Sequence, residues 1–297
     1  MKIEEFASLN RSWDKTIKRV GDYYFCKQRD AGYPIAVYSA FPLNQKVKVD
    51  RQFIKELKRK FLITQILLDL PKKDIYEYVL TTDNYSLDQF NGNQRHRIRK
   101  CQKIFSFRNP SLEDLLQEGL AINRQTIERQ SRTDSKLTDS KLWTRYVHSI
   151  YNDSRFTILG AYRENLMVAY LVVYNLEGKF NLVEAFIDRN QAKGASPMRG
   201  LLYTLINNLT GEYGKITISY GFHKFSRPTS LTRFKETMHF ERFSYAKAYV
   251  VNPVLQVALG LLVFVLIKLL HRKTFKRKWT RATIKLYQGH RRLKEAA

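Results

Sequence analysis

The sequence predicts an α/β protein with a mixed sheet, arranged as two lobes and followed by an apolar helix and a basic tail. Strand-like and helix-like runs alternate along the chain as far as Val254. The composition, with 44% hydrophobic and 27% charged residues, is that of a globular protein and excludes a disordered or low-complexity chain. A length of 297 residues suffices for about two domains, each with its own core.

The first part of the chain combines helical patterns with short apolar strands. The patterns predict helices over 6–20, 50–61 and 93–105 and strands over 33–39 and 63–70. The third of these helices is strongly basic. Arg108-Asn109-Pro110 is the expected boundary, which gives a first lobe over 1–108 and a second over 109–251.

The second lobe begins with a well-marked helix. Ser111 is a suitable N-cap, and Glu113 and Asp114 favour the first turn of a helix over 111–130. Two strand-like runs on either side of 163–166 indicate a hairpin. The remaining patterns predict helices over 141–151, 197–210 and 227–238 and strands over 156–162, 167–174, 180–187, 216–220 and 243–251.

An apolar segment follows the second lobe. Residues 254–270 contain only Gln256 and Lys268 as polar interruptions, and Asn252-Pro253 is a helix-start signal directly before them. The segment would be about 25 Å long as a helix, slightly short of a bilayer core of about 30 Å. Because it is apolar all round, we expect a membrane-associated helix over 252–271; a buried helix of the last domain is the alternative.

The chain has a formal net charge of +25, and the C-terminal tail over 272–297 is especially basic. A spanning helix would carry this tail across the membrane, against the positive-inside rule. We therefore expect residues 254–297 to bind an anionic lipid surface from the cytoplasmic side. The N-terminus lacks an apolar signal sequence, and Cys26 and Cys101 fit reduced thiols. A cytoplasmic body attached to the inner face of the cell membrane is the expectation.

The motifs of several enzyme classes are absent from the sequence. It contains no GxxxxGK[ST], no GxGxxG, no HExxH and no GxSxG. None of the six histidines has a partner at metal-ligand spacing. These absences argue against P-loop, Rossmann, zinc and triad enzymes, and no metal is expected.

One connection between a strand and a helix has the composition of an anion site. The strand over 180–187 runs into a basic turn of small residues and then into a helix opened by Ser196-Pro197. Backbone N–H groups at a helix start bind anions, and Gly194 permits close approach to the backbone. The alternative is an ordinary strand–helix connection. The candidate anion ligands are Arg189, Lys193, Gly194, Ala195 and Ser196, and Arg199 of the following helix is expected nearby as a further cation.

With this turn, the sequence resembles the GNAT N-acyltransferase superfamily, in which a similar loop binds the pyrophosphate of acyl-CoA. Three further stretches resemble the FemAB-like branch, whose members contain two GNAT folds. These are the basic NQRHRIRKCQK at 93–103, TIERQ at 126–130, and SYG at 219–221 followed by LTRFK at 231–235. The resemblance covers roughly residues 90–250.

The resemblance implies two GNAT-like lobes and an acyltransferase. The implied reaction moves an acyl group from acyl-CoA, with acetyl-CoA the foremost donor, or an aminoacyl group from tRNA, to an amine or hydroxyl. The apolar segment, and not the resemblance, suggests a lipid-linked acceptor.

Within that reading, Glu184 is the candidate general base, directly or through water, while Tyr220 and His223 protonate the leaving group or bind the acceptor. Arg129, Arg233 and Lys235 are candidate contacts for an anionic substrate. Structural roles are the alternatives: an exposed charge for Glu184 and for the three cations, a buried tyrosine for Tyr220 and a surface histidine for His223. Two other functions remain open, a non-catalytic protein that binds tRNA or other nucleic acid at a membrane, and a degenerate transferase fold.

Overall fold

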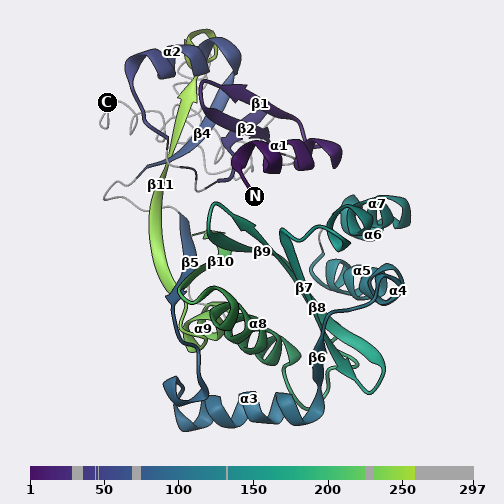
Figure 1. Cartoon of the computed structure of the whole chain (residues 1–297). Coiled ribbons are helices and arrows are strands. Elements are labelled where there is room, and N and C mark those ends of the chain that lie inside the picture. Colours follow the sequence, from purple (N-terminus) through teal and green to yellow (C-terminus); the bar gives the residue numbers. More distant parts are fainter. Residues whose placement is uncertain are drawn as a thin grey trace, which may run out of the picture. The chain divides into compact units, whose positions relative to one another are not determined.

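The computed structural model describes residues 1–28, 36–43, 45, 47–68, 75–131, 133–224 and 230–257. These residues form two compact units. The small unit contains Ile3–Tyr76 and the chain from Ser244 onward, and the large unit contains Met1–Lys2 and Glu77–Phe243. Strands β5 and β11 each run from one unit into the other (Figure 1).

The small unit is a sheet with helices at its sides. Its elements are α1 (Ile3–Ser12), β1 (Ile17–Val20), β2 (Tyr23–Lys27), β3 (Val37–Ala40), α2 (Arg51–Lys60), β4 (Ile63–Leu68) and most of β11 (Glu241–Val251). The strand order is β1-β2-β3-β4-β11, with β3 and β4 parallel and the other neighbours antiparallel. Phe25, Leu57 and Ile66 are fully buried in its core.

The expected helix over 6–20 is wrong in its second half. Helix α1 ends at Ser12, and Asp14 has a positive φ of 60°, which a helix does not allow. The following residues form β1, in which Ile17 and Val20 are buried and which pairs with β2. Burial of these two side chains against a partner strand outweighs the local helical pattern.

The sheet of the large unit has the strand order β5-β10-β9-β8-β7-β6. Its first elements are β5 (Ile75–Thr82), η1 (Leu87–Gln89), α3 (Gly92–Ile104), β6 (Ser106–Arg108), α4 (Leu112–Asp114), the π-helical turn η2 (Leu115–Gly119) and α5 (Leu120–Arg129). They are followed by α6 (Ser135–Thr138), α7 (Ser140–Tyr151), β7 (Phe156–Arg163), β8 (Leu166–Leu176), β9 (Lys179–Ile187), α8 (Pro197–Tyr213), β10 (Ile216–Lys224) and α9 (Ser230–Thr237).

Helices cover both faces of this sheet. Helix α8 packs across β6 to β10 with α3 against it, while α5 and α7 pack on β9 and β7 (Figure 1). Every residue from Val168 to Val173 in the central strand β8 is fully buried. A strand buried on both faces reads as a continuous apolar run, as this one does.

The expected lobe boundary at residue 108 falls inside the large unit. Strand β5, which was not predicted from the sequence, is a neighbour of β10, and Thr81 Oγ1 lies 3.0 Å from Thr217 Oγ1. Helix α3 packs on α8, and β6 pairs with β7. Residues 77–108 therefore belong with the large unit, and the end of β11 belongs with the small one.

The helix expected over 252–271 begins where the sequence predicts. Residues 253–257 are helical, and Asn252 caps them by accepting a hydrogen bond from the Val254 N–H at 3.0 Å. The rest of that helix and the basic tail, residues 258–297, lie outside the described residues. Within the described part of the chain, no helix has the length and apolar character needed to cross a bilayer.

Candidate active site

Strands β9 and β10 run parallel but separate after a short stretch of pairing. Their register contains only three pairs, from Lys179 opposite Thr217 to Asn181 opposite Ser219. Both strands are nine residues long, so most of each continues beyond the last pair. The two strands therefore open a gap in the sheet, in which the edge of β9 presents backbone N–H and C=O groups that β10 does not engage.

A β-bulge lies in β9 just beyond this point. Val172 of β8 is opposite Glu184, whereas the next residue, Val173, is opposite Leu182. Val183 is thus the extra residue, and it is 39% exposed although it is apolar. A bulge bends its strand and increases the local twist, which accounts for the separation of β9 from β10.

The joined end of the two strands is held by a buried carboxylate. Glu77 on β5 is 1% exposed, and its Oε1 lies 2.8 Å from Lys179 Nζ. The Ser219 hydroxyl donates a hydrogen bond to the same oxygen and accepts one from the Gly221 N–H at 3.1 Å. Three neighbouring strands are fastened here by charge-assisted bonds, so the gap begins at a fixed position.

The turn that follows β9 is organised by Asp188. Its Oδ1 accepts hydrogen bonds from the Asn190 N–H at 2.8 Å and from the Gln191 N–H at 3.1 Å. Gly194 has a φ of +91°, and a Cβ atom placed on it would meet nothing within 4 Å. Among the described residues, no protein acceptor receives the backbone N–H groups of Gly194, Ala195 and Ser196. The end of the turn therefore has three backbone N–H groups without a protein acceptor, and open space at the Cβ position of Gly194, just before α8 begins.

Helix α5 brings Arg129 to this turn. The Thr126 hydroxyl donates to the Ile187 carbonyl at 3.2 Å, and Gln125 Nε2 donates to Asp188 Oδ1 at 3.1 Å. Burial lowers the pKa of Arg129, and repulsion from Arg189 lowers it further. Arg129 and Arg189, two predicted anion contacts that are distant in sequence, are thus close in space.

Glu184 lies in a buried ion pair and not on an exposed face. Its side chain is 7% exposed, and its Oε1 lies 2.5 Å from the Nζ of Lys136 on α6. The same ammonium lies 3.9 Å from the centre of the Tyr146 ring. The pKa of the Tyr146 hydroxyl is raised by burial and then by the negative charge of Glu184. The exposed-charge alternative for Glu184 is therefore wrong, because Glu184 faces the helices that cover the sheet.

Tyr220 and Lys235 lie together beyond the joined end of β10. Lys235 on α9 is fully buried, with its Nζ 3.9 Å from the centre of the Tyr220 ring and 4.9 Å from that of Tyr78. Burial lowers the pKa of Lys235 to about 7. Burial also raises the pKa of Tyr220, which keeps its hydroxyl protonated. The alternative of an exposed charge is wrong for Lys235, which is fully buried. The side chain of His223 lies outside the described residues.

Solved structures of low sequence identity share this architecture. FemX gives a TM-score of 0.60 at 11% identity, over 85% of this chain and 92% of that chain. The C-terminal DUF2156 domain of a candidate lysylphosphatidylglycerol synthetase from Agrobacterium fabrum gives 0.54 at 12%, over 86% and 88%. The L-PGS of Bacillus licheniformis gives 0.50 at 14%, over 81% and 86%. No protein-family model and no curated protein matches the chain.

The chain has the FemAB-like double GNAT fold. This confirms the fold that the resemblance implies. At these identities the likeness establishes the fold, and the site must be argued from the residues of this chain.

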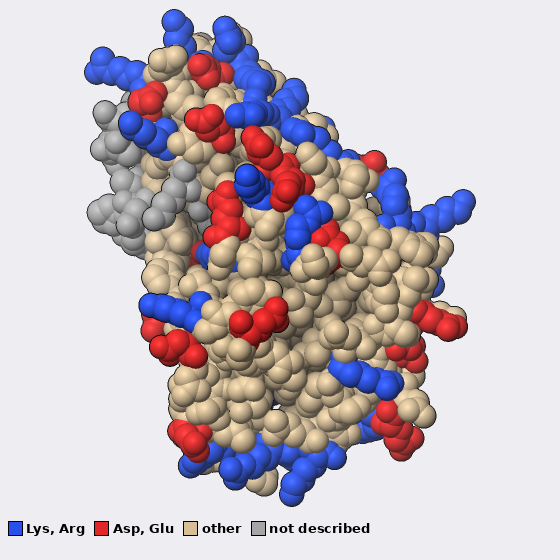
Figure 2. Space-filling view, viewed as in Figure 1, with Lys and Arg blue, Asp and Glu red and all other residues tan. Residues whose placement is uncertain are grey.

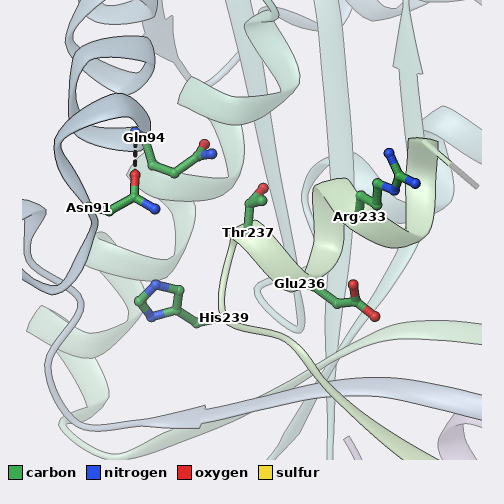
Figure 3. Close-up of a pocket in the computed structure, with 6 residues that line it drawn as sticks. All are labelled: Asn91, Gln94, Arg233, Glu236, Thr237 and His239. Atoms are coloured by element: carbon green, nitrogen blue, oxygen red, sulfur yellow. Dashed lines mark hydrogen bonds between the residues drawn. The ribbon is translucent and has the colours of Figure 1, made fainter. Parts of the chain in front are cut away.

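An open pocket of about 440 Å³ lies elsewhere on the large unit, between the start of α3 and α9. Figure 3 shows Asn91, the N-cap of α3, and Gln94 facing Thr237, the last residue of α9, and His239 just after it. Its other lining residues, Arg233 and Glu236, come from α9 itself. The predicted contact Arg233 thus lines this pocket, whereas Arg129 and Arg189 lie at the turn after β9.

Arg199 is a polar group whose position the sequence does not reveal. It is 6% exposed, and its Nη1 donates to Gln94 Oε1 at 2.6 Å and to Thr237 Oγ1 at 3.4 Å. The guanidinium also lies 5.2 Å from the centre of the Phe234 ring. The sequence predicts Arg199 as a further cation of the anion site at the turn, whereas its guanidinium is buried and bonds to Gln94. The structure uses it to join α8, α3 and α9.

Proposed function

We propose that this protein is a GNAT-type acyltransferase that moves an acyl group from acyl-CoA to an amine or hydroxyl of its acceptor. The observation that carries the proposal is the gap between β9 and β10, which leads to a turn with free backbone donors. An extended donor fits along the edge of β9, with its anionic end at the turn. Such a site orients two reactants and polarises a carbonyl, which is what acyl transfer requires.

The residues present fit a CoA pyrophosphate at the turn. The open side of Gly194 admits a phosphate next to the N–H groups of Ala195 and Ser196. Arg189 and Lys193 supply positive charge in the same turn, and Arg129 adds more from α5. Acetyl-CoA is the first donor to test, because nothing in this proposal requires a longer chain.

The reaction needs a proton acceptor for the attacking group and a proton donor for the departing sulfur. Glu184 lies beside the bulge, and we assign it the acceptor role through Oε2, since Lys136 engages Oε1. Tyr220 stays protonated and is assigned the donor role, with His223 as the second candidate. A backbone N–H on the open edge of β9 binds the carbonyl oxygen as it gains charge.

The two remaining predicted cations take different roles in this proposal. Lys235 is buried next to Tyr220, so it acts near the reacting carbonyl, where its ammonium stabilises developing negative charge. Arg233 lines the separate pocket between α3 and α9 and contacts an anionic part of a substrate there.

The proposal also includes a lipid or lipid-linked acceptor and a location at the cell membrane. One similar fold carries the name of a lysylphosphatidylglycerol synthetase, which favours a lipid or lipid-linked acceptor here as well. A cytoplasmic body attached to the inner face of the cell membrane through residues 254–297 would reach such an acceptor. Aminoacyl-tRNA is the alternative donor, because the strongly basic chain suits RNA.

Thiol release from acetyl-CoA tests the reaction. The purified full chain is incubated with acetyl-CoA and with panels of amines, hydroxyl compounds and lipid vesicles. The CoA thiol that is released reacts with an aromatic disulfide reagent, and the absorbance of the coloured product is measured. The proposal expects release that depends on an acceptor and is lost in Glu184→Gln. Release from no acyl-CoA with any acceptor would contradict it.

A non-catalytic protein that binds nucleic acid at a membrane is the second candidate function. The net charge of +25 favours it. It predicts RNA binding that weakens steeply with salt and is unaffected by Glu184→Gln, together with no transfer from either donor.

A further inference from the structure

The pocket between α3 and α9 offers hydrogen-bond donors from two side-chain amides whose oxygen atoms already accept a hydrogen bond. Asn91 Oδ1 accepts the Gln94 N–H at 3.0 Å (Figure 3). Gln94 Oε1 accepts a hydrogen bond from Arg199 Nη1 at 2.6 Å. Each side-chain amide therefore turns its NH₂ group to the pocket. Thr237 Oγ1 accepts a hydrogen bond from Arg199 and donates one to the Phe234 carbonyl at 2.8 Å. Its hydroxyl proton is therefore already used and is not a donor to a ligand in the pocket.

The charges around the pocket have an excess of positive sign. Arg233 lines it, and Arg199 lies against it with Arg97 near enough to lower the pKa of Arg199 after the larger effect of burial. The carboxylate of Glu236 is engaged by Arg242 at 3.5 Å and by the Tyr78 hydroxyl at 3.3 Å. The pocket therefore suits a ligand that is rich in acceptors and negatively charged.

The exposed side of α3 continues this positive surface. Figure 2 shows lysine and arginine side chains gathered along the lower edge of the large unit, where α3 lies in Figure 1. The helix has no acidic residue, and its apolar side chains Ile98 and Cys101 are buried. An amphipathic membrane-binding helix would expose apolar side chains, so a bilayer is the weaker partner for this surface. The cations of α3 are Arg95, Arg97, Arg99, Lys100 and Lys103.

We infer that this pocket binds a phosphate of a nucleotide, with the cations of α3 attracting the rest of a polyanionic ligand. The volume of about 440 Å³ is in the range of sites for small ligands of nucleotide size. The same chemistry is available from the 3′-phosphorylated nucleotide of CoA and from an RNA strand. The inference rests on the proposed function in one respect: it identifies the nucleotide end of the transferase donor as the occupant.

Gln94→Glu tests the pocket while preserving its internal contacts. The carboxylate keeps an oxygen for Arg199 and replaces the pocket-facing NH₂ with a negatively charged acceptor. Gln102→Glu makes the same change of charge on the exposed side of the same helix and serves as the control. Thermal midpoints without ligand establish that both variants fold.

Binding to the full-length protein and both variants is measured with CoA, with dephospho-CoA and with a fluorescent single-stranded RNA of 12 nucleotides. The inference expects Gln94→Glu to weaken binding at least tenfold, and Gln102→Glu less than threefold. Preference for CoA over dephospho-CoA identifies the coenzyme as the source, whereas tight RNA binding with little CoA binding identifies nucleic acid. Equal affinities of the two variants would overturn the inference, as would binding only to vesicles of phosphatidylglycerol.

The same experiment separates this inference from the proposed function. If the protein binds a nucleotide phosphate through Gln94 but transfers no acyl group, the proposed function is refuted and the phosphate site in this pocket is supported. Normal thiol release by Gln94→Glu, with unchanged affinity for both CoA and RNA, would refute phosphate binding in this pocket and leave the proposed function standing.

Discussion

Lys136 Nζ on α6 lies 2.5 Å from Glu184 Oε1 on β9, in the strand that bulges one residue earlier. The pair joins a helix that covers the sheet to the edge of the gap. A buried ion pair is weak evidence for stability alone, because desolvation offsets the attraction. Its place beside the gap suggests that it holds the carboxylate in position for proton transfer.

The first prediction concerns this pair. Glu184→Gln keeps the shape of the side chain but removes its charge, so we expect kcat for transfer to fall at least about 100-fold with little change in donor affinity. Lys136→Met should lower stability by about 1–3 kcal/mol, since it leaves the carboxylate buried without its partner. Steady-state kinetics measure kcat, and urea unfolding measures stability, for both single variants and for the double variant. Equal kcat in Glu184→Gln and the unmodified protein would exclude Glu184 as the base.

Lys235 makes the stability of the protein dependent on pH. Its pKa is about 7 in the folded chain and 10.5 ordinarily, so unfolding takes up a proton between these values. Stability should therefore rise with pH from about 7 to about 10, by at most about 1.4 kcal/mol per pH unit. Lys235→Met should remove this rise, while the exposed control Lys141→Met should keep it. Parallel stability–pH curves for the unmodified protein and Lys235→Met would show that Lys235 titrates normally.

Gly200 allows α8 to contact β6. A Cβ atom on Gly200 would lie 2.1 Å from Phe107 Cζ, whereas one on Gly211 of the same helix meets nothing within 4 Å. We expect Gly200→Ala to cost about 1–3 kcal/mol by overpacking and Gly211→Ala to stabilise by about 0.5–1 kcal/mol. Combining Gly200→Ala with Phe107→Leu should recover part of the loss. Chemical denaturation measures all three, and a neutral Gly200→Ala would contradict the close packing.

Attachment to a membrane is expected to depend on residues 258–297. Truncation after Val257 keeps β11 and the contact of Asn252 Nδ2 with the Lys58 carbonyl at 2.8 Å, so the small unit should remain folded. The truncated protein should no longer sediment with anionic vesicles. Its far-UV circular dichroism should show that the β-strand signal per residue is retained. Continued sedimentation would place the membrane contact in the described part of the chain.

The sequence predicted the large unit better than the small one. The capped helix at Ser111, the hairpin at 163–166 and the strand–turn–helix around Gly194 are local patterns, and each appears in the structure. Strand β1 was missed because its partner β2 decides its conformation. Strand β5 was missed because Glu77 interrupts its apolar run, and the burial of Glu77 depends on Lys179, 102 positions further along the chain.

In the candidate site, too, local patterns could be predicted from the sequence but contacts between distant residues could not. The turn after β9 could be recognised because its donors and cations are close in sequence. The pairing of Glu184 with Lys136, the burial of Lys235 under Tyr220 and the role of Arg199 depend on residues that are distant in sequence. A charged side chain gives no local sign of whether a distant element will bury it.

Binding of acetyl-CoA tests the central proposal most directly. Gly194→Trp fills the open side of the turn, and Gly178→Trp is the matched control, because Gly178 also has a positive φ, of +82°, and open space around its Cβ position. A ligand at about 100 times its dissociation constant adds roughly 2.7 kcal/mol of stability, which is visible as a raised thermal midpoint. We predict that acetyl-CoA raises the midpoint of the unmodified protein and of Gly178→Trp but not of Gly194→Trp. No shift in any of the three, or the same shift in all, would contradict an acyl-CoA site at this turn.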